Sequence, residues 1–249
     1  MWSVGTMQAN RGQAMKQFEY AANSKTYRGA LLTPKDATPT AAVVLLPDWR
    51  GQSSLAFDHA QFLVELDCVV VIADLYGEGF SPTSLDQVGA MVQTLVNNRD
   101  TGVAALHACI EQLKKVVPEG TRLYCLGYSA GGMIALDYAR TGVELDGFVL
   151  CSALLKPALP AQSTRINAPV LILQGTQDVV SPMAVINTLI SEMDSAKNDA
   201  CFVLYSQTHH AFDNPEAGSD ETARLVYSPT SAARARSSIA KFILGAEIT

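Results

Sequence analysis

One serine of this chain lies in a setting that favours nucleophilic chemistry. Ser129 is the central residue of Gly127-Tyr128-Ser129-Ala130-Gly131, between an apolar run of strand character (Thr121 to Leu126) and an apolar helical stretch. In this strand-turn-helix context a G-x-S-x-G motif holds the serine hydroxyl out from the end of a sheet. The flanking glycines allow a sharp bend without Cβ clashes. Because the motif alone also occurs by chance, its chemistry depends on partners elsewhere in the chain.

The partners of a catalytic serine are a base that takes its proton and an acid that orients the base. Asp178 follows the apolar run Val170 to Gln174, and His209 and His210 follow the run Cys201 to Tyr205. Each candidate therefore comes just after a predicted strand, at the edge where open parallel sheets bind ligands. The order serine, aspartate, histidine is the one found with this motif. We therefore expect a triad of Ser129, Asp178 and one of the two histidines.

Other interpretations of these polar residues remain open at this stage. Asp178 could cap the turn ahead of the helical segment that begins near Met183. Asp213 is a rival acid, but it is too close in sequence to His210 to orient that ring easily. His59 and His107 fall in amphipathic helical patterns and are expected on helix surfaces or in the core, not in catalysis.

Strand-like and helical segments alternate along the chain, which predicts an α/β fold with a mostly parallel, doubly wound sheet. The predicted strands are Ala42 to Leu46, Val69 to Ala73, Arg122 to Leu126, Phe148 to Cys151, Val170 to Gln174 and Phe202 to Tyr205, preceded by edge strands Phe18 to Tyr20 and Thr26 to Leu32. The predicted helices are Ala56 to Leu66, Thr101 to Val116 behind an Asp100 cap, Met133 to Arg140, Met183 to Met193 and Ala232 to Leu244. Residues 15–249 are expected to form one domain behind a flexible leader, residues 1–14, with a partial lid at Ser81 to Leu95.

The overall composition argues against several classes of function. The 249 residues are 48% apolar and 17% charged, and the net charge of −6 gives no footprint for nucleic acid. No long apolar run or signal peptide is apparent, and five cysteines without C-x-x-C spacing favour a reducing compartment. No metal-ligand spacing or phosphate-binding loop is present, so no metal or cofactor is expected. These features predict a soluble cytoplasmic protein, monomeric or homodimeric, without membrane or nucleic-acid partners.

Five motifs in order resemble the dienelactone hydrolase family of the α/β-hydrolase fold, from about Met15 to Leu244. They are Leu45-Leu-Pro-Asp-Trp-Arg-Gly51, Asp74-Leu-Tyr-Gly-Glu-Gly79, Gly127-Tyr-Ser-Ala-Gly-Gly132, Gln174-Gly-Thr-Gln-Asp178 and His210-Ala-Phe-Asp-Asn-Pro215. The resemblance selects His210 over His209, because the family's catalytic histidine directly precedes a small residue and phenylalanine. It also implies an oxyanion hole from the backbone N–H groups of Trp49 and Ala130.

This chain departs from the family pattern at three positions. Family members usually carry cysteine where Ser129 stands, so the resemblance implies serine esterase chemistry with His210 as the base. Glu78 and Asn214 stand where dienelactone hydrolases carry arginines for a substrate carboxylate, which argues against an anionic dienelactone, with Arg50 and Arg99 as alternative cations for that carboxylate. Asp48 occupies the position of an acid that controls the thiol in cysteine members. Beside a serine, its role is either structural or catalytic.

The resulting hypothesis is a hydrolase of small carboxylic esters or lactones. The candidate pocket residues, chosen by their place in the site loops, are Asp48, Arg50, Tyr76, Glu78 and Phe212. Two alternatives use the same residues: an acyltransferase or thioesterase with the same triad, and a catalytically silent hydrolase-like binding protein.

Overall fold

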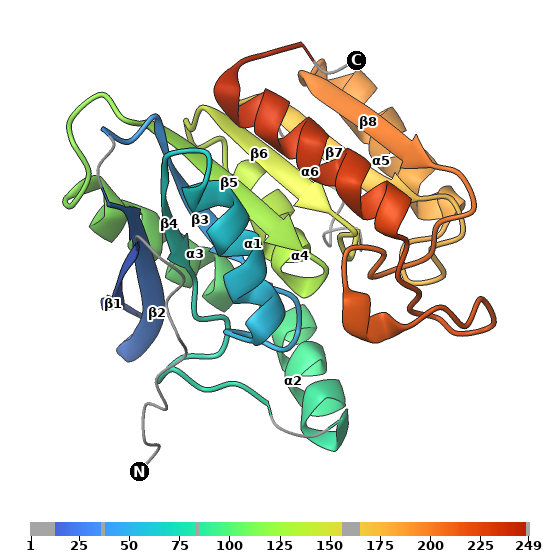
Figure 1. Ribbon diagram of the computed structural model, residues 1–249, viewed down its shortest axis with the longest axis horizontal. Helices are drawn as coiled ribbons and strands as arrows, with labels where there is room; N and C mark the ends of the chain where they lie inside the picture. Colours follow the sequence, from blue (N-terminus) through green and yellow to red (C-terminus); the bar gives the residue numbers. More distant parts are fainter. Residues whose placement is uncertain (1–12, 36–37, 83–84, 156–164, 248–249) are drawn as a thin grey trace.

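An eight-stranded sheet forms the centre of the computed structural model, which describes residues 13–35, 38–82, 85–155 and 165–247 (Figure 1). The strand order is β1-β2-β4-β3-β5-β6-β7-β8. The antiparallel strands β1 and β2 form a hairpin at one edge, and β2 pairs antiparallel with β4. All pairings from β4 to β8 are parallel. This is the mostly parallel α/β sheet that the sequence pattern predicts.

The strands lie close to their predicted positions. They are β1 (Gln13–Ala22), β2 (Lys25–Pro34), β3 (Ala41–Leu46), β4 (Cys68–Ile72), β5 (Arg122–Tyr128), β6 (Gly147–Cys151), β7 (Val170–Gly175) and β8 (Ala200–Tyr205). Strand β1 extends well beyond the predicted segment Phe18 to Tyr20, because Lys16 and Gln17 are exposed and polar, whereas β2 lies close to its predicted bounds. Residues 1–12 of the predicted leader lie outside the described residues, and residues 13 and 14 belong to β1.

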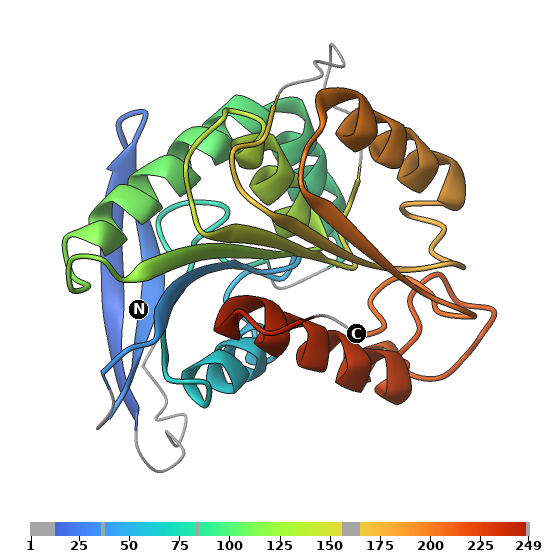
Figure 2. The same cartoon turned by 90° about the horizontal axis from the view of Figure 1, so that it is seen from above.

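The helices are arranged in two layers, one on each face of the sheet (Figure 2). They are α1 (Ser54–Val64), α2 (Leu85–Asn97), α3 (Arg99–Lys114), α4 (Ala130–Ala139), α5 (Met183–Ala196) and α6 (Pro229–Leu244). Helices α3, α4 and α5 cover one face, and α1 and α6 cover the other. Asp100 is not the cap of α3, since that helix begins at Arg99 with Asn98 in the cap position.

Strand β3 shows how the sheet is buried on both faces. Every residue of β3 is buried. Ala42, Val44 and Leu46 pack in the core under α3 to α5, whereas the alternate residues, such as Val43 and Leu45, pack in the core under α1 and α6. This period of two is the geometry of a strand whose side chains point alternately to opposite faces. The near-continuous apolar runs in the sequence therefore correspond to strands between two cores.

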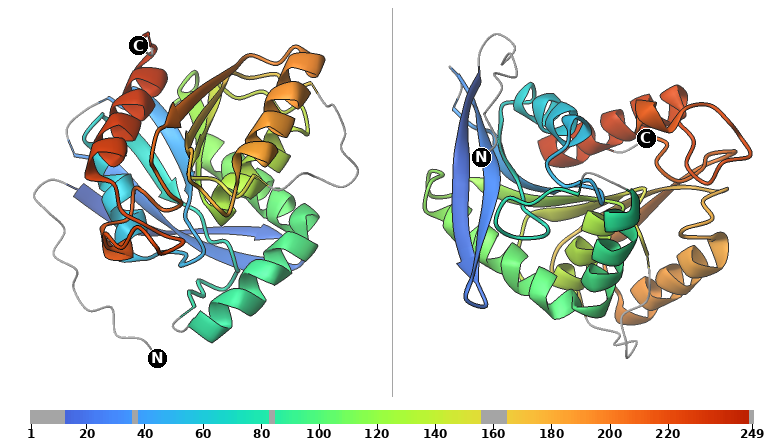
Figure 3. Two further views of the ribbon diagram at one scale, coloured as in Figure 1. Left: turned by 90° about the vertical axis from the view of Figure 1, so that its right-hand side faces the viewer. Right: turned by 90° about the horizontal axis from the view of Figure 1, so that it is seen from below.

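Helix α2 occupies most of the segment predicted as a partial lid. It follows the loop after β4 and lies at the carboxyl ends of the parallel strands, on the same side of the molecule as the long loop after β8 (Figures 1 and 3). Of its side chains, Leu95 is buried, whereas Met91 and Val96 are half-buried. Within the described parts of the chain, no helix is long and apolar enough to cross a membrane.

Candidate active site

Ser129 lies at the turn between β5 and α4, in a backbone conformation that few residues adopt. Its dihedral angles are φ 46° and ψ −114°. A residue with a Cβ reaches such angles only at an energetic cost, which is typical of a nucleophile at an elbow. The backbone carbonyl of Ser129 accepts a hydrogen bond from the Leu154 amide at 2.9 Å, and its own amide donates to the Cys151 carbonyl. The end of β6 and the residues directly after it thus hold the turn in place.

The glycines of the motif are required by close packing. A Cβ on Gly127 would lie 2.6 Å from the Cα of Gly132, and one on Gly132 would lie 2.5 Å from the Cβ of Ala153. A Cβ on Gly131 would meet the carbonyl oxygens of Leu46 and Pro47. None of the three glycines has a positive φ. These glycines therefore leave space for neighbouring atoms that a Cβ would displace. The strained backbone dihedral angle is that of Ser129 itself.

Three side chains from separate loops form a continuous chain of hydrogen bonds. The Oγ atom of Ser129 lies 2.9 Å from Nε2 of His210. On the other side of the ring, Nδ1 of His210 lies 2.7 Å from Oδ2 of Asp178. Ser129 follows β5, Asp178 follows β7 and His210 follows β8. The parallel strands bring these loops to one edge of the sheet, as the strand order requires.

Asp178 combines the two roles that its sequence context suggests. Its Oδ1 accepts hydrogen bonds from the amides of Val180 and Ser181, at 2.7 and 2.9 Å, and thereby closes the turn before α5. Its Oδ2 faces His210 and also accepts from the Gln174 side chain at 3.2 Å. Burial raises the pKa of this carboxyl, but the hydrogen bonds from His210 and the two amides outweigh burial and hold the pKa below its ordinary value. Asp178 is therefore charged at neutral pH and suited to orient an imidazole.

Ser152, at the end of β6, is a further polar residue at the triad. It is buried and has φ 46°. Its Oγ lies 3.5 Å from Nδ1 of His210 and accepts a hydrogen bond from the Ala211 amide at 2.8 Å. Sequence reasoning missed this residue. Its position directly after a predicted strand was the available signal, because polar residues at the carboxyl ends of strands face the site.

The remaining histidines and the rival acid lie outside this chain of hydrogen bonds. Asp213 forms no hydrogen bond or ion pair with His210; its Oδ2 lies 3.3 Å from Nε2 of His59. His59 is buried in α1 and stacks on Tyr128 with a centroid distance of 3.9 Å. His107 is exposed on α3 and contacts Tyr138 through Nδ1.

The candidate catalytic pocket is small and is lined by Ser129 and His210. Its volume is about 30 Å³. Its lining consists of Asp48, Trp49, Tyr128, Ser129, Ser152, His210, Ala211, Asp213, Asn214 and Leu225. Among the described residues, the backbone amides of Trp49 and Ala130 have no hydrogen-bond acceptor in the protein. Ala130 is also the first residue of α4, where the helix dipole favours negative charge.

Two of the predicted pocket residues, Asp48 and Arg50, form an ion pair beside the pocket. Asp48 lines the pocket but is bound by Arg50, which contacts it through its amide and guanidinium. Arg50 itself does not line the pocket; it also pairs with Glu216 at 2.7 Å and lies over the Trp49 ring. Both charges of the pair are therefore largely satisfied within the protein.

Three other predicted pocket residues also lie outside the lining of the candidate catalytic pocket. Glu78 is exposed and pairs with Arg28 at 2.6 Å. Phe212 is fully buried in the core, where its ring packs edge-on against Tyr205. Its sequence position predicts a place in the pocket, but its apolar ring is buried in the core beneath the loop. Tyr76 lines a separate cavity, and its hydroxyl donates to the Trp49 carbonyl at 2.6 Å.

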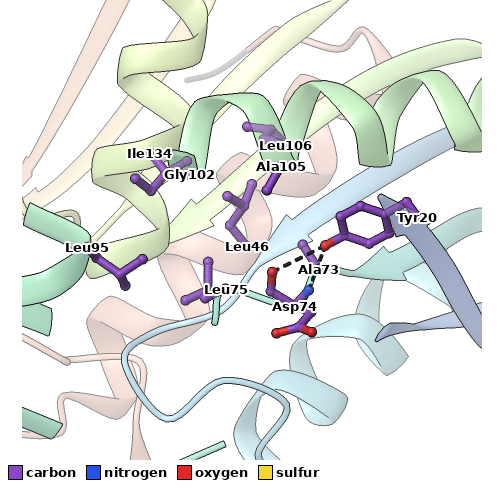
Figure 4. A pocket seen from close by; sticks show the side chains of 10 residues that line it. All are labelled: Tyr20, Leu46, Ala73, Asp74, Leu75, Leu95, Gly102, Ala105, Leu106 and Ile134. Atoms are coloured by element: carbon purple, nitrogen blue, oxygen red, sulfur yellow. Dashed lines mark hydrogen bonds between the residues drawn. The ribbon is translucent and has the colours of Figure 1, made fainter. Parts of the chain in front are cut away.

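Asp74 shapes the loop that carries Tyr76 and Glu78. Its carboxylate accepts hydrogen bonds from four backbone amides, those of Arg28, Tyr76, Gly77 and Gly79. The Tyr20 hydroxyl bonds to the backbone of Asp74 as both donor and acceptor (Figure 4). Asp74 is thus a structural residue, and the D-L-Y-G-E-G motif encodes a fixed loop.

The dienelactone hydrolase family model matches residues 27–244 of this chain. The chain belongs to this family. Among solved structures, the dienelactone hydrolase family member is similar to a protein named m3DLH, at 25% identity and a TM-score of 0.85 over 93% of this chain and 98% of that one. It is also similar to a dienelactone hydrolase-like promiscuous phosphotriesterase from metagenomic libraries, at 21% identity and a TM-score of 0.85 over 93% and 98% of the two chains.

More distant structures show the wider α/β-hydrolase fold. An esterase from Pyrococcus furiosus is 16% identical, with a TM-score of 0.60 over 78% of this chain and 83% of that one. No protein of curated function matches the sequence. The family and its neighbours make this chain a hydrolase of the α/β-hydrolase fold. Within the described residues, no group of three or more His, Cys, Asp or Glu side chains is placed to hold a metal ion.

Proposed function

We propose that this dienelactone hydrolase family member cleaves small carboxylic esters or lactones through an acyl-enzyme on Ser129. The observation that carries the proposal is the unbroken hydrogen-bond chain from Ser129 through His210 to Asp178, with Ser129 strained at the elbow. A serine, an imidazole and a buried carboxylate at these distances are the components of nucleophilic acyl transfer.

The proposed first half-reaction forms the acyl-enzyme. The Oγ of Ser129 attacks the ester carbonyl carbon while its proton passes to Nε2 of His210. The imidazolium is stabilised by the charged Asp178, which also keeps Nδ1 protonated. The tetrahedral oxyanion accepts hydrogen bonds from the unpaired amides of Trp49 and Ala130. When the intermediate collapses, the bond between the carbonyl carbon and the alkoxy oxygen breaks and His210 gives its proton to the leaving alcohol.

The second half-reaction repeats these steps with water. His210 removes a proton from water as the water oxygen attacks the acyl carbon, and the proton returns to the Oγ of Ser129 as the carboxylic acid leaves. An alcohol or thiol in place of water would give acyl transfer with the same residues. Free Ser129 hydroxyl is regenerated in either case.

The charge around the pocket favours neutral substrates. Asp48 and Asp213 line it, and the nearby guanidinium of Arg50 is already engaged by Asp48 and Glu216. An anionic substrate would therefore meet the Asp213 carboxylate and an Asp48 carboxylate already paired with Arg50, without a free cation in the described lining. Asn214, at the position of a family arginine, lines the pocket as a neutral residue.

Covalent labelling and a matched ester panel test the proposal. A fluorophosphonate probe should label the wild-type protein and not the Ser129→Ala variant, because only the activated serine reacts with it. The variant should lose activity on p-nitrophenyl acetate by roughly a millionfold. An unlabelled wild-type protein would favour the silent binding protein. Products formed with added alcohols or thiols separate hydrolysis from transfer, and a phosphotriester tests the activity named for one structural neighbour.

A further inference from the structure

The catalytic pocket has too little room for a substrate with a sizeable acyl group. Its volume of about 30 Å³ holds roughly two water molecules. Acetyl esters need little space beyond the reacting carbonyl, but each additional methylene needs room that this pocket does not offer. A longer acyl chain would therefore extend beyond this pocket, over the protein surface or into a neighbouring space.

A second cavity of about 270 Å³ lies under α2. We call it the α2 cavity. It is lined by Lys25, Tyr27, Leu75, Tyr76, Met91, Thr94, Leu95, Asn98, Thr101 and Gly102. Apolar and aromatic side chains with a few polar groups form the usual lining of small-molecule sites, and an apolar cavity of roughly 150 Å³ already accepts benzene. The α2 cavity is therefore large enough for a short alkyl chain or an aromatic ring.

The α2 cavity and the catalytic pocket approach each other at Tyr76 and Trp49. Tyr76 lines the cavity, Trp49 lines the pocket, and the Tyr76 hydroxyl donates to the Trp49 carbonyl at 2.6 Å. The amide of Trp49 is one of the two proposed oxyanion donors. The boundary between the two spaces thus lies beside the position of the substrate carbonyl.

The strand order decides which part of an ester would point toward the α2 cavity. The loop with Tyr76 follows β4, on one side of the strand that carries Ser129, whereas His210 follows β8 on the other side. His210 must protonate the leaving alcohol, so the alcohol lies on the His210 side. The acyl group, at the opposite end of the ester, then points toward β4 and α2.

We propose that the α2 cavity receives the acyl chain of the substrate, and that the preferred esters carry a neutral, apolar acyl group of medium length. This inference rests on the proposed function. A small neighbouring void of about 10 Å³ shares Leu75, Leu95 and Gly102 with the cavity and extends the apolar surface toward α4 (Figure 4). Met91 and Leu95 of α2 provide the wall that an alkyl chain would contact, and the charged group of the lining, Lys25 Nζ, donates a hydrogen bond to the Tyr76 carbonyl.

Two p-nitrophenyl esters test the proposal because they share a leaving group and differ only in the acyl chain, acetyl against hexanoyl. Met91→Trp fills the cavity from α2, and Thr101→Phe fills it from α3. Each variant should lower kcat/KM for the hexanoyl ester by about tenfold or more while changing kcat/KM for the acetyl ester less than about twofold. Gln93→Trp, at an exposed position of α2, is the matched control and should leave both values unchanged.

The two proposals fail in different ways. If the filling variants hydrolyse both esters as the wild type does, or lose both activities in parallel, the α2 cavity does not hold the acyl chain, while Ser129 labelling and acetyl ester hydrolysis still support the proposed function. If the wild type hydrolyses neither ester and Ser129 is not labelled, the proposed function itself fails. The two cavity-filling substitutions lie in different helices, so if one variant unfolds, the other still tests the proposal.

Discussion

The hydroxyl of Ser152 accepts a hydrogen bond from the backbone amide of Ala211 at 2.8 Å. Ala211 follows His210 and has φ 58°, an uncommon angle for a residue with a Cβ. Ser152 therefore helps to hold the His210 loop in a conformation that it would not adopt alone. We infer that Ser152 is a positioning residue for the base.

Replacement of Ser152 should impair turnover more than binding. In Ser152→Ala, kcat on p-nitrophenyl acetate should fall by about tenfold with KM changed less than about twofold, because His210 remains but is less well placed. Steady-state kinetics measure both constants. Ser206→Ala removes an exposed hydroxyl two residues before Thr208 and is the control. Wild-type kcat in Ser152→Ala would show that the loop holds its conformation without this bond.

The adjacent histidines should differ sharply in their importance. His210→Ala removes the group that contacts both Ser129 and Asp178, and its activity should fall about as far as that of Ser129→Ala. His209→Ala should retain most of the activity, since no bond joins the His209 side chain to the triad. Initial rates on one ester compare the two variants. A greater loss in His209→Ala would mean that the loop rearranges during catalysis.

The positions of the strands along the chain, the two helical layers and the three side chains at the sheet edge could be predicted from the sequence, whereas the order of the strands in the sheet was not predicted. Apolar runs buried on both faces mark the strands, and a polar residue directly after such a run lies at the carboxyl edge. That logic located Ser129 and Asp178 and placed His210 within a two-residue choice. Applied to the strand that ends at Cys151, it would also have located Ser152.

The surroundings of the site were harder to predict because they depend on tertiary contacts. Phe212 and Glu78 both lie in loops near the site, yet one side chain is buried beneath its loop and the other pairs with Arg28 on the surface. Sequence position gives a loop's location but not the direction of its side chains. The α2 cavity likewise arises between segments distant in sequence, so no local pattern indicates it.

The contact between His59 and Asp213 should contribute to stability without contributing to the triad. His59→Phe keeps an aromatic ring stacked on Tyr128 but leaves the largely buried Asp213 carboxylate without its partner. The free energy of unfolding should fall by about 1–3 kcal/mol, the cost of an unsatisfied buried polar group. Urea denaturation measures it. Asp58→Ala, at the exposed neighbouring position of α1, is the control, and equal effects in the two variants would refute a special role for Asp213.

Protonation of Asp178 in acid should lower the free energy of unfolding. Its folded pKa lies below the ordinary value of 3.8, so its charged form stabilises the fold fully above that value. This stabilisation is lost as the pH falls through the lower folded pKa. Urea denaturation between about pH 6 and 3 should therefore show a shallower decline for Asp178→Asn than for the wild type. Asp58→Asn, at an exposed position of α1, is the control and should follow the wild-type curve.

Two glycine-to-alanine substitutions should have effects of opposite sign. A Cβ on Gly127 would lie 2.6 Å from Gly132 Cα and 2.7 Å from Gly131 O, and because both are backbone atoms the elbow must shift. We expect Gly127→Ala to lower the free energy of unfolding by about 1–3 kcal/mol and to slow fluorophosphonate labelling of Ser129. At Gly89, in α2, a Cβ meets nothing within 4 Å, and alanine should stabilise the helix by up to about 1 kcal/mol. Wild-type labelling kinetics in Gly127→Ala would show that the elbow tolerates the extra methyl group and that its glycine is not needed to position the nucleophile.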